Sequence, residues 1–199
     1  MPAILVGASS TPDIVTVPAR LALAIDGSGA PASEGFAQSL GALYGIAYTL
    51  KFGRKTSGRG TPFKVAAMEG RWSAEGWADP AAPPPPETWQ WRLRICVPPD
   101  VTQTEVADSI REATTKKKGK LEGSTAAAQV FLEDLPEQRC GRILHVGPYA
   151  DEPRSFATLA QVIEAAQLKA AHWHIEVYLS DPRRTAPQKL KTVLLKEVQ

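Results

Sequence analysis

The sequence predicts an α+β protein in which duplicated β-α-β-β modules form one antiparallel sheet with helices on one face. Two observations favour this fold class. Each half of the chain runs in the order strand, glycine turn, helix, strand, strand. In addition, Leu135-Pro136 before the second turn repeats the pattern of Val17-Pro18 before the first. Coincidence of element order is the alternative, and duplication accounts better for both observations.

The first half opens with a β-rich stretch, residues 14–25, which Pro18 interrupts and the turn signal Asp26-Gly27 ends. Ser33 can cap a following helix, whose apolar residues recur at helical spacing as far as Leu50. The later elements of this half are a basic, glycine-rich loop at 51–60, a strand at 63–73, a proline-rich loop at 79–87 and a strand at 89–97.

A helix should link the two halves, because Thr102 and Glu105 have the spacing of a capping box. The second half then supplies strands at 129–135 and 138–146, a helix at 153–168, and strands at 172–180 and 192–198. We therefore expect a single domain, residues 1–199, made of two pseudo-repeats at about 12–98 and 127–199 that a helical linker joins.

The bulk composition is that of a globular chain with a substantial core, since 43% of the 199 residues are hydrophobic and 22% are charged. A formal net charge of +2 is too small to indicate nucleic-acid binding. No apolar run approaches the roughly 20 residues that span a bilayer, and the start of the chain lacks a basic leader. We expect a cytoplasmic monomer or weak homodimer with no direct nucleic-acid or membrane partner.

Neither the cysteines nor the histidines indicate a metal site. Cys96 and Cys140 are the only cysteines, which favours ordinary buried thiols over a disulfide. The three histidines lie far from any CxxC pair. The chain also lacks a glycine-rich phosphate loop and a nucleophile elbow. We therefore expect no metal and no cofactor.

The strand at 172–180 carries the sharpest functional signal. Because side chains alternate across a strand, one face holds His172, His174, Glu176 and Tyr178, and the other face is apolar. Titratable groups of this kind need partners or water. A solvated outer face is one interpretation, and the wall of a polar groove is the one we favour.

A second glutamate supports the groove. Glu69 lies near the middle of the strand at 63–73, and a twofold repeat would bring Glu69 and Glu176 together near the shared axis. Two carboxylates in one cavity can hold a cation or divide acid and base roles. A surface position before a turn is the alternative for Glu69. We expect this central ligand groove on the sheet face opposite the helices, with Glu176, Glu69, Tyr178 and His174 as its candidate catalytic residues.

Aromatic residues on neighbouring elements could complete the groove. Tyr44 and Tyr48 lie one turn apart on the first helix. Trp72 and Trp77 flank the proline-rich loop, and Trp89 shares one face of a strand with Trp91. Trp and Tyr commonly line sites for flat or cationic ligands. The candidate ligand-binding residues are Tyr44, Tyr48, Trp72, Trp89, His145 and Tyr149.

Several motifs in a fixed order resemble a known family. They are Ile25-Asp26-Gly27, Leu43-Tyr44, Met68-Glu69-Gly70, Trp89 with Trp91, His145-Val146-Gly147-Pro148-Tyr149, and the stretch from Glu176 to Arg184. Together they resemble the stand-alone GyrI-like small-molecule-binding proteins, which are related to the effector-binding domains of AraC-type and MerR-type regulators. The resemblance implies paired β-α-β-β modules around a central cleft, with Glu176 as the ligand-facing glutamate. Ile175 departs from the pattern, because the resemblance places a second histidine there.

Three function classes follow. The first is a protein that binds hydrophobic or cationic aromatic small molecules, such as drugs or toxins, for protection or sequestration. The second, which the resemblance implies for some relatives, is a hydrolase that opens the cyclopropane ring of DNA-alkylating natural products with a Glu-activated water. The third is an effector-sensing partner of a transcription regulator. Binding alone ranks first, since the residues support a groove better than they support any proton transfer.

Overall fold

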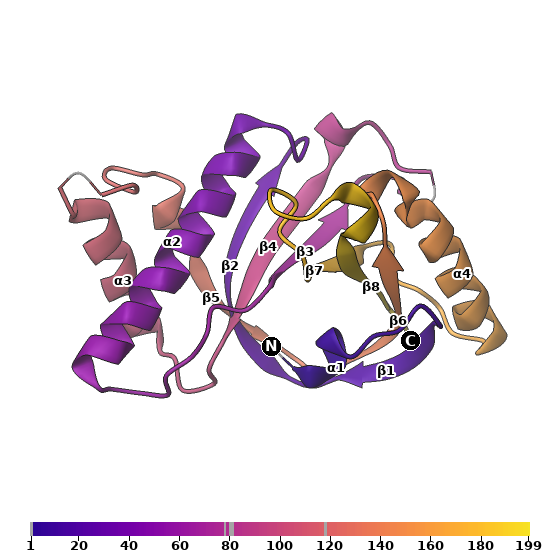
Figure 1. Ribbon diagram of the computed structural model, residues 1–199, viewed down its shortest axis with the longest axis horizontal. Coiled ribbons are helices and arrows are strands. Elements are labelled where there is room, and N and C mark those ends of the chain that lie inside the picture. The colour runs from indigo at the N-terminus through magenta and orange to yellow at the C-terminus, as the bar shows by residue number, and fades with distance from the viewer. Residues whose placement is uncertain (1, 78, 80–81, 118) are drawn as a thin grey trace.

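A computed structural model describes residues 2–77, 79, 82–117 and 119–199, and these residues form one antiparallel sheet flanked by helices (Figure 1). The α+β prediction is confirmed. The helices are α1 Ala3–Val6, α2 Glu34–Ser57, α3 Gln103–Thr115 and α4 Glu152–Ala165. The strands are β1 Asp13–Val17, β2 Arg20–Ser28, β3 Met68–Ser73, β4 Gln90–Val97, β5 Phe131–Leu135, β6 Gln138–Val146, β7 His174–Tyr178 and β8 Lys191–Glu197.

The order of the strands is symmetric about the centre of the sheet. The sheet runs β1-β6-β8-β7-β3-β4-β2-β5, with β7 and β3 paired in the middle. The order stays the same when β1, β2, β3 and β4 are exchanged with β5, β6, β7 and β8 respectively and the sheet is read from its other edge. Each half also lends its first strand to the other half, because β1 pairs with β6 and β5 pairs with β2.

One row of residues across the sheet shows that α2 and α4 cover the same face. The directly opposed residues of this row are Ile25, Leu93, Gly70, Glu176, Leu194 and Ile143. Opposed residues in neighbouring strands point to the same face. Ile25 belongs to the core cluster that α2 covers, and Ile143 to the cluster that α4 covers. Glu176 therefore lies on the helix-bearing face, between the two helices.

The opposite face of the sheet is occupied in its second half. Leu5 of α1 packs there against Ile175, Val177 and Val193. Because this apolar cluster fills the space, the expectation of a ligand groove on the face opposite the helices is wrong.

The first long helix extends further than the sequence predicts. Ser33 caps it as expected, accepting a hydrogen bond from the Phe36 amide. The expected loop at 51–60 is wrong over its first part, because α2 continues to Ser57 and ends at Gly58 with φ of 66°. Buried Arg54 stabilises this extra turn, since its guanidinium binds carboxylates near the start of α3, 2.8 Å from Glu105 Oε2.

Two expected strands are shorter in the structure. β3 begins at Met68, because the segment after α2 is held elsewhere through the Thr61 amide, which donates to Asp100 Oδ2 at 2.8 Å. β7 begins at His174, so His172 lies outside the strand, exposed and against the Trp173 ring. The capping box at Thr102 and the strand at 138–146 are confirmed.

The cysteines and the helix lengths agree with what the composition of the sequence predicts. Cys96 and Cys140 are both buried and free, as predicted. Among the helices that the structure describes, none is long and apolar enough to cross a membrane.

The exchanged strands predict that neither half folds alone. Fragments 1–122 and 123–199 each leave an edge strand without its partner and expose the central β3 edge or β7 edge. Each fragment alone should show weak far-UV circular dichroism and no cooperative thermal transition, and mixing them should restore both signals. Cooperative unfolding of either isolated fragment would contradict this dependence.

Candidate functional site

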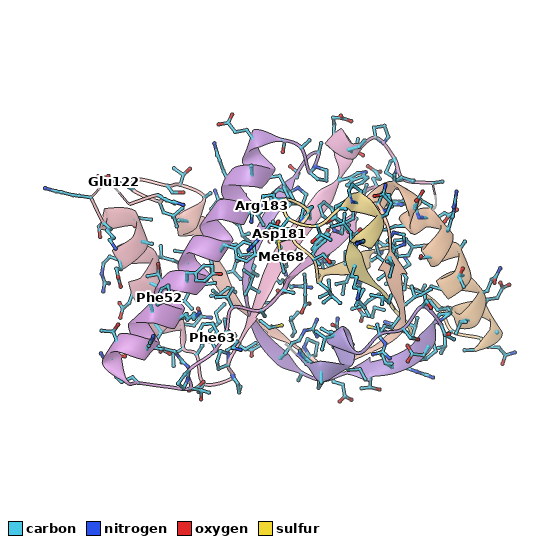
Figure 2. All side chains as sticks on the ribbon, viewed as in Figure 1. Phe52, Phe63, Met68, Glu122, Asp181 and Arg183 are labelled. Atoms are coloured by element: carbon cyan, nitrogen blue, oxygen red, sulfur yellow. The ribbon has the colours of Figure 1, made fainter. Side chains whose placement is uncertain are left out.

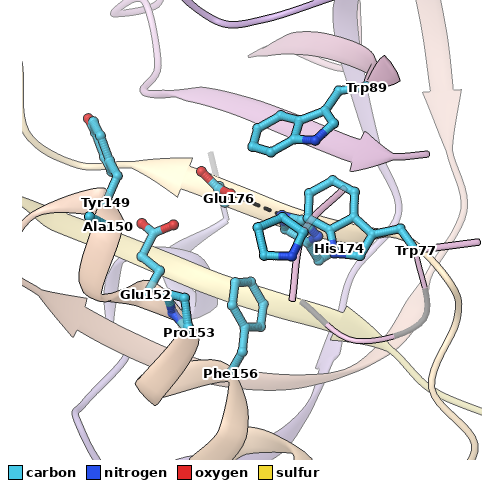
Figure 3. Close-up of a pocket in the computed structure, with 10 residues that line it drawn as sticks. Trp77, Trp89, Tyr149, Ala150, Glu152, Pro153, Phe156, His174 and Glu176 are labelled. Carbon is cyan, nitrogen blue, oxygen red and sulfur yellow. Dashed lines mark hydrogen bonds and ion pairs between the residues drawn. The ribbon is translucent and has the colours of Figure 1, made fainter. Parts of the chain in front are cut away.

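A cavity of about 290 Å³ lies between α4, β7 and the proline-rich loop that joins β3 to β4 (Figure 3). Its lining combines aromatic rings with two carboxylates. The lining residues are Trp77, Pro83, Trp89, Tyr149, Ala150, Glu152, Pro153, Phe156, His174 and Glu176.

Local structure explains how these side chains converge. His174 and Glu176 are two residues apart on β7, so both point to the helix-bearing face. Glu152 and Phe156 are four residues apart on α4, so they lie on one side of that helix. A fifth lining residue, Trp77, comes from the turn that follows β3.

The two tryptophans of the cavity pin the proline-rich loop. Trp77 Nε1 donates to the Asp79 carbonyl at 3.0 Å, and Trp89 Nε1 donates to the Pro84 carbonyl at 2.9 Å. Their ring centroids are 4.9 Å apart. Because both indole N–H groups are bonded to the loop, the indole carbons are left to face the cavity. Trp77, Pro83 and Trp89 thus line one side of the cavity.

Glu176 is held by hydrogen bonds on both oxygens. The Tyr178 hydroxyl donates to Oε2 at 2.7 Å, and His174 Nε2 lies 3.0 Å from Oε1. Trp72 Nε1 in turn donates to the Tyr178 oxygen at 3.0 Å. Burial, and next the negative charge of Glu176, raises the pKa of Tyr178 well above its ordinary value, so this phenol stays a donor. The Glu176 carboxylate therefore has a fixed orientation at the cavity.

Gly70 makes this arrangement possible. It lies opposite Glu176 in the central strand pair. A Cβ atom at Gly70 would lie 2.7 Å from Trp72 Nε1, which is too close for any real contact. The absence of a side chain thus allows the indole of Trp72 to cover Gly70 and reach Tyr178.

Glu152 is the second carboxyl group of the cavity, and it lacks hydrogen-bond partners. Its side chain is 5% exposed, and Oε1 is buried with no hydrogen bond. Burial, and next the charge of Glu176, raises the pKa of Glu152 to about 9. The nearby Thr192 hydroxyl acts in the opposite direction and lowers the pKa of Glu152, but it does so less than the other two causes raise it. Thr192 Oγ1 is itself buried without a hydrogen bond. At neutral pH the cavity therefore holds a neutral carboxyl group beside Glu176.

Four of the predicted site residues line this cavity. They are Trp89, Tyr149, His174 and Glu176. Two more predicted residues lie behind Glu176. Tyr178 donates a hydrogen bond to Glu176, and Trp72 donates one to Tyr178. Tyr149 contacts the Tyr178 ring edge to face at 5.9 Å, and burial raises the pKa of Tyr149 to about 12.

Three predicted ligand-binding residues lie elsewhere. Tyr48 is 45% exposed on α2 and stacks on Phe52. Tyr44 on α2 packs against the core, and the charges of Asp181 and Arg183 act on its hydroxyl. Figure 2 labels these two charged side chains, which lie in the loop between β7 and β8. His145 is buried, with its ring nitrogens 2.9 Å from Ser155 Oγ and 3.1 Å from the Pro148 carbonyl, so it fixes the turn before α4.

Glu69 does not share a cavity with Glu176, and that expectation is wrong. Glu69 lies opposite Val177, on the other face of the sheet. It is fully buried there, ion-paired to Arg20 at 2.9 Å and accepting a hydrogen bond from the Cys96 thiol at 3.1 Å. The physical reason is the period of the strand, since neighbouring residues point to opposite faces.

Sequence reasoning missed Glu152 and Phe156 as cavity residues, and it noted Trp77 beside the proline-rich loop without selecting it as a ligand-binding residue. A glutamate at the first position of a helix has the ordinary appearance of an acid that favours the helix dipole. Phe156 belongs to the apolar cluster under α4 and is buried, and its side chain also lines the cavity. The signal that could have found Glu152 is its place three residues after Tyr149, in the motif Gly147-Pro148-Tyr149 that precedes the helix. Within the described part of the chain, no three potential metal ligands gather.

Comparisons with known proteins agree with this geometry. The model of the GyrI-like small molecule binding domain matches residues 99–195, so the resemblance predicted from the sequence is confirmed. No curated protein matches the chain.

Solved structures with the same architecture include an uncharacterized conserved protein from Listeria innocua, with a TM-score of 0.87 and 29% identity, covering 97% of this chain and 94% of that one. A hydrolase from Listeria innocua has a TM-score of 0.83, with 29% identity and coverage of 97% and 94%. The EcmrR C-terminal domain, at 12% identity and a TM-score of 0.55 over 94% of this chain and 96% of that one, shares the fold alone.

The raised pKa of Glu152 predicts a pH-dependent cost to stability. The carboxyl group is neutral in the unfolded chain only below about pH 4.5, whereas in the folded protein it stays neutral up to about pH 9. Between these pH values the carboxyl group is ionised only in the unfolded state, so rising pH stabilises the unfolded state relative to the folded state. Glu152→Gln should therefore raise the free energy of unfolding by roughly 2 kcal/mol or more at pH 8 and have little effect at pH 4.

Urea denaturation of both proteins at the two pH values measures this difference. Glu164→Gln, an exposed change on the same helix, is the matched control and should have no effect at either pH. An equal stability change for Glu152→Gln at pH 4 and pH 8 would show that its ionisation does not oppose folding.

Proposed function

We propose, from the GyrI-like domain of residues 99–195, that the protein binds a small aromatic cation in the cavity at Glu176 and sequesters it. One observation carries the proposal: a buried Glu152 oxygen without a hydrogen-bond partner stands beside the fixed carboxylate of Glu176 in an aromatic-walled cavity. A positive charge placed there would offset both carboxyl groups.

The shape of the cavity supports a flat and compact ligand. A volume of about 290 Å³ is at the lower end for sites that hold drug-sized molecules. Trp77 and Trp89 supply indole rings to the lining, and indole attracts cations more strongly than other aromatic side chains. A ligand of one or two fused rings with a single positive charge fits this chemistry, as drug-like and toxin-like compounds do.

Cation binding should be coupled to proton release. The charge of Glu176 and burial keep the proton on Glu152 in the free protein. A bound cation favours the ionised carboxylate, so it should lower the pKa of Glu152 and expel the proton. Affinity for a cation should therefore rise with pH up to about pH 9.

Hydrolysis is the second candidate function. The similar structure described as a hydrolase favours it, as does the pairing of an oriented carboxylate with a neutral carboxyl group. Glu176 would take a proton from water, whose oxygen attacks a carbon of a strained cyclopropane ring. The broken carbon–carbon bond would leave its electrons on the conjugated part of the substrate, and Glu152 would supply the proton there. A role as partner of a regulator gains no such support, because the EcmrR likeness concerns the fold alone.

The binding proposal predicts a charge-dependent affinity. At pH 8, 1-methylquinolinium should bind at least about tenfold more tightly than quinoline, a neutral compound of the same ring system. Glu176→Gln should remove most of this difference, and Glu164→Gln should preserve it. Calorimetry in two buffers of different ionisation enthalpy should show proton release on cation binding, which Glu152→Gln should abolish. Equal affinity for the two compounds would rule out cation recognition.

The hydrolysis candidate predicts a chemical product. Incubation with a cyclopropane-containing alkylating natural product should give its water adduct, detected by mass spectrometry, faster than the reaction without protein. Glu176→Gln should then lower kcat by about 100-fold while changing affinity little. If the adduct forms no faster with the wild-type protein, this cavity binds without catalysis of that reaction.

A further inference from the structure

A second cavity adjoins the first across Trp77. It has a volume of about 380 Å³ and is lined by Ser73, Ala74, Glu75, Gly76, Trp77, Gln90 and His172. Of the residues that the structure describes, Trp77 alone lines both this outer cavity and the inner cavity at Glu176. Trp77 is 6% exposed, so its buried indole separates the two cavities.

Trp77 is fixed in that position from both ends. Its backbone amide donates to the Ala74 carbonyl at 3.2 Å, in a turn where Gly76 has φ of 72°. Its Nε1 donates to the Asp79 carbonyl, and its ring contacts the rings of Trp89 and His174, each with centroids 4.9 Å away. The partition between the two cavities is therefore a built feature of the fold.

The chemistry of the outer cavity differs from that of the inner cavity. Its polar side chains are those of Ser73, Glu75, Gln90 and His172, and none of the four makes a side-chain hydrogen bond to another described residue. Ser73 and Gln90 lie directly opposite each other at the end of the β3–β4 pair, which sets their spacing. Glu75 adds a negative charge. Acceptor oxygens around one carboxylate suit a protonated amine.

We propose that the outer cavity is a second subsite of the same ligand-binding site, which receives a protonated amine at the end of an elongated aromatic cation. The inference rests on the proposed function, because the aromatic cation occupies the inner cavity. The connecting chain of the ligand passes Trp77, and Glu75, with Gln90 and Ser73, binds the amine. Trp77 thus sets the spacing that a ligand needs between its ring and its amine.

A matched pair of compounds tests the subsite. The pair is 1-pentylquinolinium and 1-(5-aminopentyl)quinolinium, which differ only in the terminal amine, and 1-methylquinolinium reports on the inner cavity alone. At pH 7 the amine compound should bind the wild-type protein about tenfold more tightly than the pentyl compound. Glu75→Gln should remove that advantage and leave the affinity for 1-methylquinolinium unchanged. Glu164→Gln, which removes the same charge elsewhere on the surface, should keep it.

Trp77→Phe tests the partition while keeping an aromatic wall. It should weaken 1-methylquinolinium several-fold, and it should weaken the amine compound less because the shorter wall eases the path between the cavities. Thermal unfolding of each variant checks that the fold is intact, and Gln90→Ala provides a second removal of an amine contact.

The outcomes separate the two proposals. If 1-methylquinolinium binds but the amine gives no advantage, or if the advantage survives both Glu75→Gln and Gln90→Ala, the outer subsite is disproved and the proposed function stands. If 1-methylquinolinium does not bind the wild-type protein, the proposed function fails, and the subsite fails with it.

Discussion

The register of the central strand pair is the constraint on which the cavity depends. Because Gly70 lies opposite Glu176, the carboxylate points to the helix-bearing face and the space above Gly70 is free for the Trp72 indole. A shift of one residue would turn Glu176 to the opposite face, where Ile175 and Val177 now pack with α1. That shift would place a charge in an apolar cluster and an isoleucine at the cavity, so the apolar face and the polar site enforce the same register.

Glu152 is a buried carboxyl group that the fold alone does not favour. Burying a carboxyl group without hydrogen bonds costs stability, and the proton that it retains lowers that cost by removing the charge. Glu69 presents the opposite solution on the other face, where Arg20 and Cys96 satisfy its two oxygens. A fully paired glutamate has nothing left to offer a ligand. The unpaired oxygen of Glu152 and its place in one cavity with Glu176 distinguish this candidate site from the structural ion pair of Glu69.

The sequence predicted the parts of the structure that follow from local patterns. The order of elements, the caps at Ser33 and Thr102 and the alternation of β7 required only short-range rules. Glu152, the second carboxyl group of the cavity, was missed. Its position beside Glu176 depends on how α4 docks against β7, and no local sequence pattern encodes that docking. The exact end of α2 was missed for a similar reason, since Arg54 finds its carboxylate partners on α3.

The symmetry of the sheet explains both the wrong glutamate pair and the presence of a cavity in one half. β2 and β6 each have nine residues and follow Val17-Pro18 and Leu135-Pro136 at the same distance. Carrying that equivalence through the strand registers matches Gly70 with Glu176 and Trp72 with Tyr178, so Glu69 corresponds to Ile175. The first half thus places a glycine and a large indole where the second half places a carboxylate and a phenol. The Trp72 indole fills the corresponding space in the first half and also donates to Tyr178, which donates to Glu176. A side chain of the first half thus helps to orient the glutamate of the second half.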